Sequence, residues 1–250
     1  MSIALFDVQA GFGGPAPWGS ETAGPDEWLA EMRRLDIARS LVHTTPDDSI
    51  ADAPAANEEL YAACKGHPEL VPCPILIPNG GHDLPPEEDQ VARAISEAAG
   101  AAFLRPQKDH WELDAWCSGP LFQALEARGL PAYCENMKFA LADLAKIAQT
   151  YPELPVILAK LHYLQQRSLV PLLKAFPNVH VSIGSNYVVY QGLEMLVDEV
   201  GADRLLFGTG FPDAEPMGAV TMLTYAGISD EAKQRIGAHN LERLMEGIRQ

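Results

Sequence analysis

The chain has 250 residues, 47% of them hydrophobic, which is enough for one large α/β domain with a full core. The 34 acidic and 18 basic side chains give a net charge of −16, which argues against nucleic acid and anionic membranes as general partners. A local basic pocket for an anionic metabolite remains compatible with this charge.

Cysteine usage and the N-terminal sequence bear on the compartment. The four cysteines form neither a CxxC pair nor a zinc-ribbon spacing, which favours reduced cytosolic thiols: Cys64, Cys73, Cys117 and Cys134. The opening "MSIALFDVQAGFGG" has no basic region, and no stretch approaches the ~20 apolar residues of a membrane span. We therefore expect a soluble, cytoplasmic protein.

Short apolar runs alternate with helical patterns along the whole chain. The predicted strands are residues 3–7, 38–43, 70–77, 100–105, 130–135, 155–160, 178–183 and 204–208. The predicted helices are residues 25–36, 55–67, 87–99, 119–129, 140–151, 165–176, 190–200 and 229–250. The strand runs are continuously apolar, as expected of parallel strands buried on both faces.

Eight strand–helix units in this length predict an α/β fold, a (β/α)8 TIM barrel spanning residues 1–250 as a single domain. A doubly wound open sheet also alternates strands and helices, but the first turn lacks a GxGxxG phosphate cradle. Because barrel active sites lie on the loops after strands, residues 10–24 and 106–118 are the expected pocket walls.

In a barrel, the carboxyl ends of the strands converge on one pocket. The side chains expected there come from all parts of the chain: Asp7, Gln9, His43, Arg105, Glu135, Lys160, His162, Ser182, Asn186, Thr209 and Asp213.

Five segments carry a resemblance to a known family. They are "LFDVQAG" (5–11), "GLPAYCE" (129–135), "VILAKLH" (156–162), "FGTGFP" (207–212) and "HNLERL" (239–244). In this order they resemble the amidohydrolase-related barrels, the branch that includes aminocarboxymuconate-semialdehyde decarboxylase and the dicarboxylate lactonases. The resemblance covers nearly the whole chain and implies an amidohydrolase-like TIM barrel, in a family whose members are often homodimers.

The chain departs from that family where the family places its metal ligands. Four histidines and an aspartate are replaced, and the positions hold Gln9, Gly11, Glu135, Lys160 and Gly210. A divalent metal needs several histidine or carboxylate donors, and a lysine ammonium would repel it. We therefore expect no metal and no other cofactor.

Glu135 and Lys160 lie at neighbouring strand ends, so their side chains are expected to meet. One interpretation is charge substitution, in which the ammonium replaces the lost cation and Glu135 compensates it. The other is acid/base or Schiff-base chemistry with shifted pKa values. His162, two residues after Lys160, is expected on the same side of the strand and is the third catalytic candidate, against a structural role.

The expected substrate-binding residues are Arg105, His43, Gln9, Asn186, Trp111 and Asp213. Arg105 suits bidentate recognition of a substrate carboxylate, or else pairs with an acid such as Asp7 or Glu135. His43 is otherwise an ordinary buried histidine, and Trp111 is otherwise a packing residue. Asp213 either reaches back to replace the carboxylate missing at Gly210 or caps a helix.

Three functions remain open on these residues. The first is a metal-independent hydrolase, lyase or isomerase that acts on a small carboxylate-bearing molecule. The second is a non-catalytic ligand-binding or scaffolding barrel whose site has decayed. The third is a metal-dependent hydrolase with rebuilt ligands, namely Glu135, His162, Gln9 and Asp213.

Overall fold

The computed structural model describes residues 3–13, 23–44, 52–135, 140–184 and 187–250. Its strands are β1 (Phe6–Phe12), β2 (Arg39–Thr44), β3 (Leu70–Pro72), β4 (Ala102–Leu104), β5 (Ala132–Glu135), β6 (Val156–Ala159), β7 (Val179–Ile183) and β8 (Leu205–Phe207). Its α-helices are α1 (Pro25–Leu35), α2 (Ala53–Cys64), α3 (Glu87–Ser96), α4 (Ala115–Arg128), α5 (Leu141–Thr150), α6 (Gln166–Ala175), α7 (Gly192–Val200), α8 (Pro216–Tyr225), α9 (Asp230–Gln234) and α10 (Asn240–Glu246).

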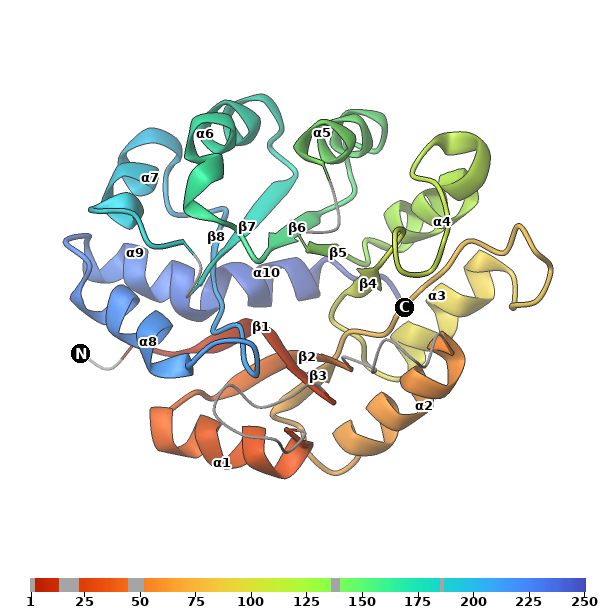
Figure 1. Ribbon diagram of the computed structural model, residues 1–250, viewed down its shortest axis with the longest axis horizontal. Helices are drawn as coiled ribbons and strands as arrows, with labels where there is room; N and C mark the ends of the chain where they lie inside the picture. The colour runs from red at the N-terminus through yellow and green to blue at the C-terminus, as the bar shows by residue number, and fades with distance from the viewer. Residues whose placement is uncertain (1–2, 14–22, 45–51, 136–139, 185–186) are drawn as a thin grey trace.

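The strands form a ring of parallel strands with the helices outside it (Figure 1). Regular pairing forms one sheet in the strand order β1-β2-β3 and a second sheet in the strand order β4-β5-β6-β7-β8. Single parallel bridges, Ile75 with Phe103 and Ala10 with Phe211, join the two sheets at both seams. At the β1–β8 seam, the Gly11 N–H donates to the Phe211 carbonyl at 2.8 Å. The predicted TIM barrel is confirmed.

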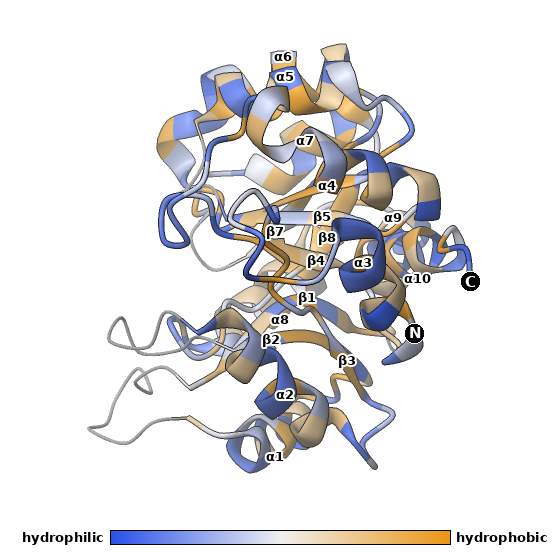
Figure 2. Cartoon of the chain, turned by 90° about the vertical axis from the view of Figure 1, so that its right-hand side faces the viewer, coloured by the Kyte–Doolittle hydropathy of each residue, from blue (hydrophilic) through white to orange (hydrophobic). Residues whose placement is uncertain are grey.

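Alternation along the strands separates two hydrophobic clusters. In β5, Tyr133 belongs to the cluster inside the ring, whereas Ala132 and Cys134 belong to the cluster between strands and helices. The strands are mostly hydrophobic, and hydrophilic residues gather on the outer helices and loops (Figure 2). At the carboxyl ends of the strands, a residue that lies two positions after an interior residue is therefore also expected to face the inside of the ring.

The C-terminal segment closes one end of the ring. Ala238, Leu241 and Leu244 pack in the interior cluster, together with Phe6 and Leu41 from the strands. Sequence periodicity predicts one helix over 229–250, but a π-helical turn at Arg235–His239 separates α9 from α10. That turn brings Gly237 against the start of β1, where a β-carbon would lie 2.9 Å from the Ile3 side chain.

The structure adds α8, which the periodicity does not predict. Its sequence, PMGAVTMLTY, is apolar on most sides, so no amphipathic pattern marks it. In the described ranges, no helix is both long and apolar enough to cross a membrane. The single-domain assignment stays a prediction.

Candidate functional site

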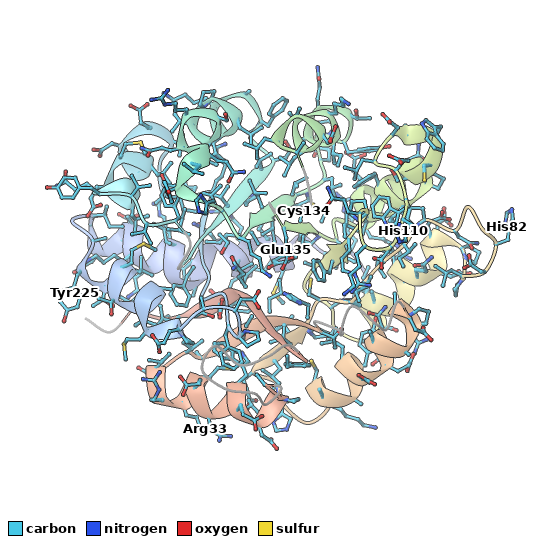
Figure 3. The ribbon with its side chains drawn as sticks, viewed as in Figure 1. Arg33, His82, His110, Cys134, Glu135 and Tyr225 are labelled. Carbon is cyan, nitrogen blue, oxygen red and sulfur yellow. The ribbon has the colours of Figure 1, made fainter. Side chains whose placement is uncertain are left out.

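Three of the predicted site residues enter the pocket for the same geometric reason. His43, Arg105 and Glu135 each lie two positions after an interior residue, namely Leu41, Phe103 and Tyr133. Figure 3 shows Glu135 near the middle of the ring, whereas Arg33, His82 and Tyr225 lie at the periphery. We use the name strand-end cluster for Gln9, His43, Arg105, Glu135, Lys160 and Asp213.

Lys160 joins two carboxylates at the centre of the strand-end cluster. Its Nζ lies 2.9 Å from Glu135 Oε1 and 2.6 Å from Asp213 Oδ2. The Glu135 side chain is 1% exposed, that of Lys160 18% and that of Asp213 49%, so the ammonium connects a buried acid to a half-exposed one. The expected meeting of Glu135 and Lys160 is present in the structure.

The backbone at Lys160 explains how the side chain turns inward. Strand β6 ends at Ala159, and Lys160 has φ of 53°, in the left-handed region that few non-glycine residues adopt. Its backbone N–H donates to Gln9 Oε1 at 3.0 Å, which holds the residue in this conformation. The strand alternation that placed His162 on the same side as Lys160 therefore does not extend to these residues.

The pKa of Lys160 is raised above its usual value. Burial is the largest single influence and acts to lower it, but attraction to Glu135 and hydrogen bonds to Asp213 and Glu135 together outweigh burial. Lys160 is therefore an ammonium at neutral pH. A protonated amine is a poor nucleophile, so the geometry favours charge substitution over Schiff-base chemistry.

The Gln9 side chain fills the space beside Gly210, which has no side chain of its own. A β-carbon at Gly210 would lie 3.1 Å from Gln9 Nε2, and Gly210 itself has φ of 79°. The other end of the amide, Oε1, accepts hydrogen bonds from Ser182 Oγ at 2.9 Å and from the Lys160 N–H. Both lone pairs of this oxygen are thus directed at donors.

The His43 ring fills the space beside Gly11, the second glycine at a strand end of this site. A β-carbon at Gly11 would lie 2.9 Å from His43 Cε1, so only glycine leaves room for this ring. The ring packs on Phe103 and Tyr133, and its Nε2 lies 3.8 Å from Glu135 Oε1. An imidazole therefore borders the buried carboxylate, although it comes from β2 rather than β1.

Asp7 lies beneath these groups and is fully buried. Its carboxylate accepts hydrogen bonds from Thr209 Oγ1 at 2.5 Å, the Thr209 N–H at 2.9 Å and the Gln9 N–H at 2.8 Å. Burial raises the pKa of Asp7 to about 6, and the hydrogen bonds from Thr209 and Gln9 oppose this shift. Asp7 thus ties β1 to the turn after β8.

Arg105 has a partner that the sequence reasoning did not name. Its Nε and Nη2 donate to the two carboxylate oxygens of Asp109 at 3.0 and 2.7 Å. Asp7 and Glu135, the acids considered from the sequence, are not the partners in this pair. The i, i+4 spacing of arginine and aspartate in "RPQKD" is the signal that would have found it, had a helical turn been expected there.

The remaining candidates divide between cap, core and turn positions. His162 Nδ1 accepts a hydrogen bond from the Leu164 N–H at 3.3 Å as the cap of a 3₁₀ turn, so its catalytic role stays a prediction. Trp111 is buried in the outer core cluster. Glu215, not Asp213, precedes α8 at the N-cap, and Asp213 instead pairs with Lys160. Its role as a substitute for the carboxylate missing at Gly210 stays a prediction. Asn186 lies outside the described residues.

The donors at this site do not fit a divalent metal ion. A cation beside Glu135 and Asp213 would meet the Lys160 ammonium, which already pairs with both. Gln9 Oε1 has no lone pair left for a metal, and Gly11 and Gly210 supply no donor. Within the described ranges, no group of three or more His, Cys, Asp or Glu side chains could hold a metal.

We predict that Lys160→Met lowers the free energy of unfolding at pH 7 by about 3–5 kcal/mol, because the buried Glu135 would lose its ion pair with this ammonium. Asp213→Asn, at a half-exposed position, should cost no more than about 1 kcal/mol. The double variant Lys160→Met/Glu135→Gln should recover most of the loss. Urea denaturation measures all three, and a Lys160→Met protein as stable as wild type would contradict the pairing.

A second prediction concerns pH. Because the pKa of Asp7 is raised from 3.8 to about 6, its protonation favours the native state; this contribution is complete below about pH 4 and is lost as pH rises through 6. The stability of wild type relative to Asp7→Asn should therefore fall by on the order of 3 kcal/mol between pH 4 and 7 and then stay constant. A pH-independent difference in urea denaturation would show that burial does not perturb Asp7.

Sequence comparison identifies the family. The model of the family described as Amidohydrolase matches residues 19–245, which is most of the chain. Comparison with curated proteins gave no significant match.

Solved structures share the fold at low sequence identity. A 5-carboxyvanillate decarboxylase from Novosphingobium aromaticivorans, with manganese and 4-hydroxy-3-methoxy-5-nitrobenzoic acid, has a TM-score of 0.76 at 13% identity, covering 98% of this chain and 96% of its own. A 2,6-dihydroxybenzoate decarboxylase from Rhizobium has a TM-score of 0.70 at 17% identity, with 98% and 99% covered. An uncharacterized TIM-barrel protein from Bordetella bronchiseptica has 0.73 at 15%, with the same coverage. The motif segments, the barrel and the family match agree, and the chain belongs to the amidohydrolase family.

Proposed function

We propose that this protein binds and converts a small carboxylate-bearing molecule at the strand-end cluster without a divalent metal. The observation that carries the proposal is the Lys160 ammonium, held between Glu135 and Asp213 at a site where the family resemblance places metal ligands. A fixed positive charge in a partly buried site can stabilise negative charge on a bound molecule, as a metal ion does.

We assign different tasks to Lys160 and Glu135. An ammonium has three N–H donors. Lys160 donates one to Asp213 and forms an ion pair with Glu135, so among the described residues it keeps a donor for a ligand oxygen. Glu135 is the candidate to exchange a proton with the ligand, because it is buried next to this cation and next to His43. The reaction class is therefore proton transfer within a lyase, hydrolase or isomerase reaction.

The relatives of similar fold suggest the class of ligand. A further structure of similar fold is a 2,6-dihydroxybenzoate decarboxylase in complex with 2,6-dihydroxybenzoate, and the 5-carboxyvanillate decarboxylase contains a hydroxy-methoxy-nitrobenzoic acid. Both ligands are small aromatic acids. In this chain, Arg105 supplies a guanidinium at the next strand end and Trp111 an aromatic surface in the following loop. Small aromatic carboxylates are accordingly the first compounds to test.

One observation favours a second candidate, a barrel that binds such a molecule without converting it. Lys160 is already paired with two carboxylates, an arrangement that also serves purely to stabilise a site that has lost its metal. The third possibility, a metal site rebuilt from Glu135, His162, Gln9 and Asp213, conflicts with the contacts that Glu135, Gln9 and Asp213 make with Lys160. Cytoplasmic location, homodimer formation and the absence of a nucleic-acid partner stay proposals.

The test is calorimetric binding of hydroxybenzoates, followed by product analysis, on protein treated with a chelator. Binding of at least one aromatic acid should survive the chelator and weaken about 10- to 100-fold in Lys160→Met, as expected for loss of a charged hydrogen bond. The matched control is Lys146→Met, which removes an exposed lysine paired with Asp143 on α5 and should bind like wild type.

Two outcomes separate the candidates. Binding with product formation supports the enzyme, and binding with unchanged ligand supports the non-catalytic barrel. Binding that disappears with the chelator and returns with added manganese would contradict both. The double variant Lys160→Met/Glu135→Gln provides the same information if the single variant is too unstable to purify.

A further inference from the structure

We infer that Asp109 occupies the subsite at Arg105 that receives the carboxylate of the ligand, so that binding exchanges one carboxylate for another. The inference rests on the proposed function and adds the residue that controls access to the anion-binding side chain. It makes Asp109 a determinant of affinity rather than a part of the chemistry.

The pair has the geometry of ligand recognition. Arg105 and Asp109 make two nearly parallel contacts, and both side chains are only 2% exposed. A guanidinium fork binds the carboxylate of a small acid in the same bidentate way. Asp109 therefore presents to Arg105 the group that a small organic acid would present.

The contact depends on a short piece of backbone. The N–H groups of Lys108 and Asp109 both donate to the Arg105 carbonyl, which makes a single turn directly after β4. The next residue, His110, has φ of 54°, a conformation that costs free energy for a residue with a side chain. Opening this turn would release Asp109 and relieve that strain without disturbing the pairing of β4.

A cavity lies beside this turn. It has a volume of about 930 Å³, and Asp109, Trp111, Trp116 and Pro78 are among the residues that line it. Trp111 is buried, and its indole Nε1 has no hydrogen-bond partner among the described residues. The ring of an aromatic acid in this cavity would contact Trp111 and Trp116, which both line it.

The subsite also borders the strand-end cluster. Leu104 pairs with Cys134 across β4 and β5, so the following residues, Arg105 and Glu135, lie at neighbouring positions of the ring. A ligand carboxylate that replaced Asp109 at Arg105 would therefore be held next to the Glu135–Lys160 pair. This neighbourhood connects the anion subsite to the groups proposed for proton transfer.

The experiment uses benzoate as the probe, benzamide as its neutral counterpart, and calorimetry with tryptophan fluorescence on the full chain. If most molecules have Asp109 paired with Arg105, Asp109→Asn should tighten benzoate binding about tenfold or more. The reason is that the apparent Kd scales inversely with the fraction of molecules in which Arg105 is released from Asp109. Arg105→Met should abolish benzoate binding. Benzamide, which carries no charge, should bind the Asp109→Asn protein no more tightly than it binds wild type.

The matched control is Asp203→Asn, which breaks an arginine–aspartate pair with Arg235 on the surface. Benzoate binding should be the same in this variant as in wild type. Asp109→Ser repeats the test if Asp109→Asn does not fold. Benzoate affinity that is equal in wild type and both Asp109 variants, or absent from all of them, overturns the inference.

Failure of the inference and failure of the proposed function give different results. If benzoate binding depends on Lys160 but not on Asp109, the proposed function stands and the exchange of carboxylates is wrong. If binding tightens in the Asp109 variants but is unaffected by Lys160→Met, the Arg105 subsite is real and the proposed role of Lys160 is wrong.

Discussion

A carboxylate buried at the mouth of a barrel requires a cation, and in this protein Glu135 obtains it from the chain itself. The Lys160 ammonium lies 2.9 Å from Glu135 and also reaches Asp213, which raises the pKa of Lys160 and keeps it charged. Because removing either partner of a buried pair leaves an uncompensated charge, the two residues depend on each other. The unusual backbone at Lys160 and its hydrogen bond to Gln9 serve this pairing.

The other replaced positions of the strand ends also compensate one another. Gly11 leaves the room that the His43 ring occupies, and Gly210 leaves room beside the Gln9 amide. Gln9 in turn accepts hydrogen bonds from Lys160 and Ser182, so this part of the ring is both packed and hydrogen-bonded. These replacements match one another in space and in hydrogen bonding, as the proposed metal-free site requires.

Much of the architecture could be predicted from the sequence, because continuous apolar runs alternating with amphipathic helices define parallel strands in chain order. The meeting of Glu135 and Lys160 followed from their places at neighbouring strand ends. Local backbone geometry defeated the finer predictions. The strand rule failed at Lys160, whose positive φ breaks the alternation, and the Asp109 partner of Arg105 depends on a turn that no hydrophobic period encodes.

The central proposal is that the Lys160 ammonium, rather than a divalent ion, is the cation at the strand-end cluster. The most direct measurement is the metal content of the protein, purified from cells supplied with zinc and manganese and dialysed before inductively coupled plasma mass spectrometry. We expect far less than one metal ion per chain, in wild type and in Asp213→Asn alike. Close to one zinc or manganese ion per chain, retained through dialysis, would contradict the claim and return Glu135 and its neighbours to the role of metal ligands.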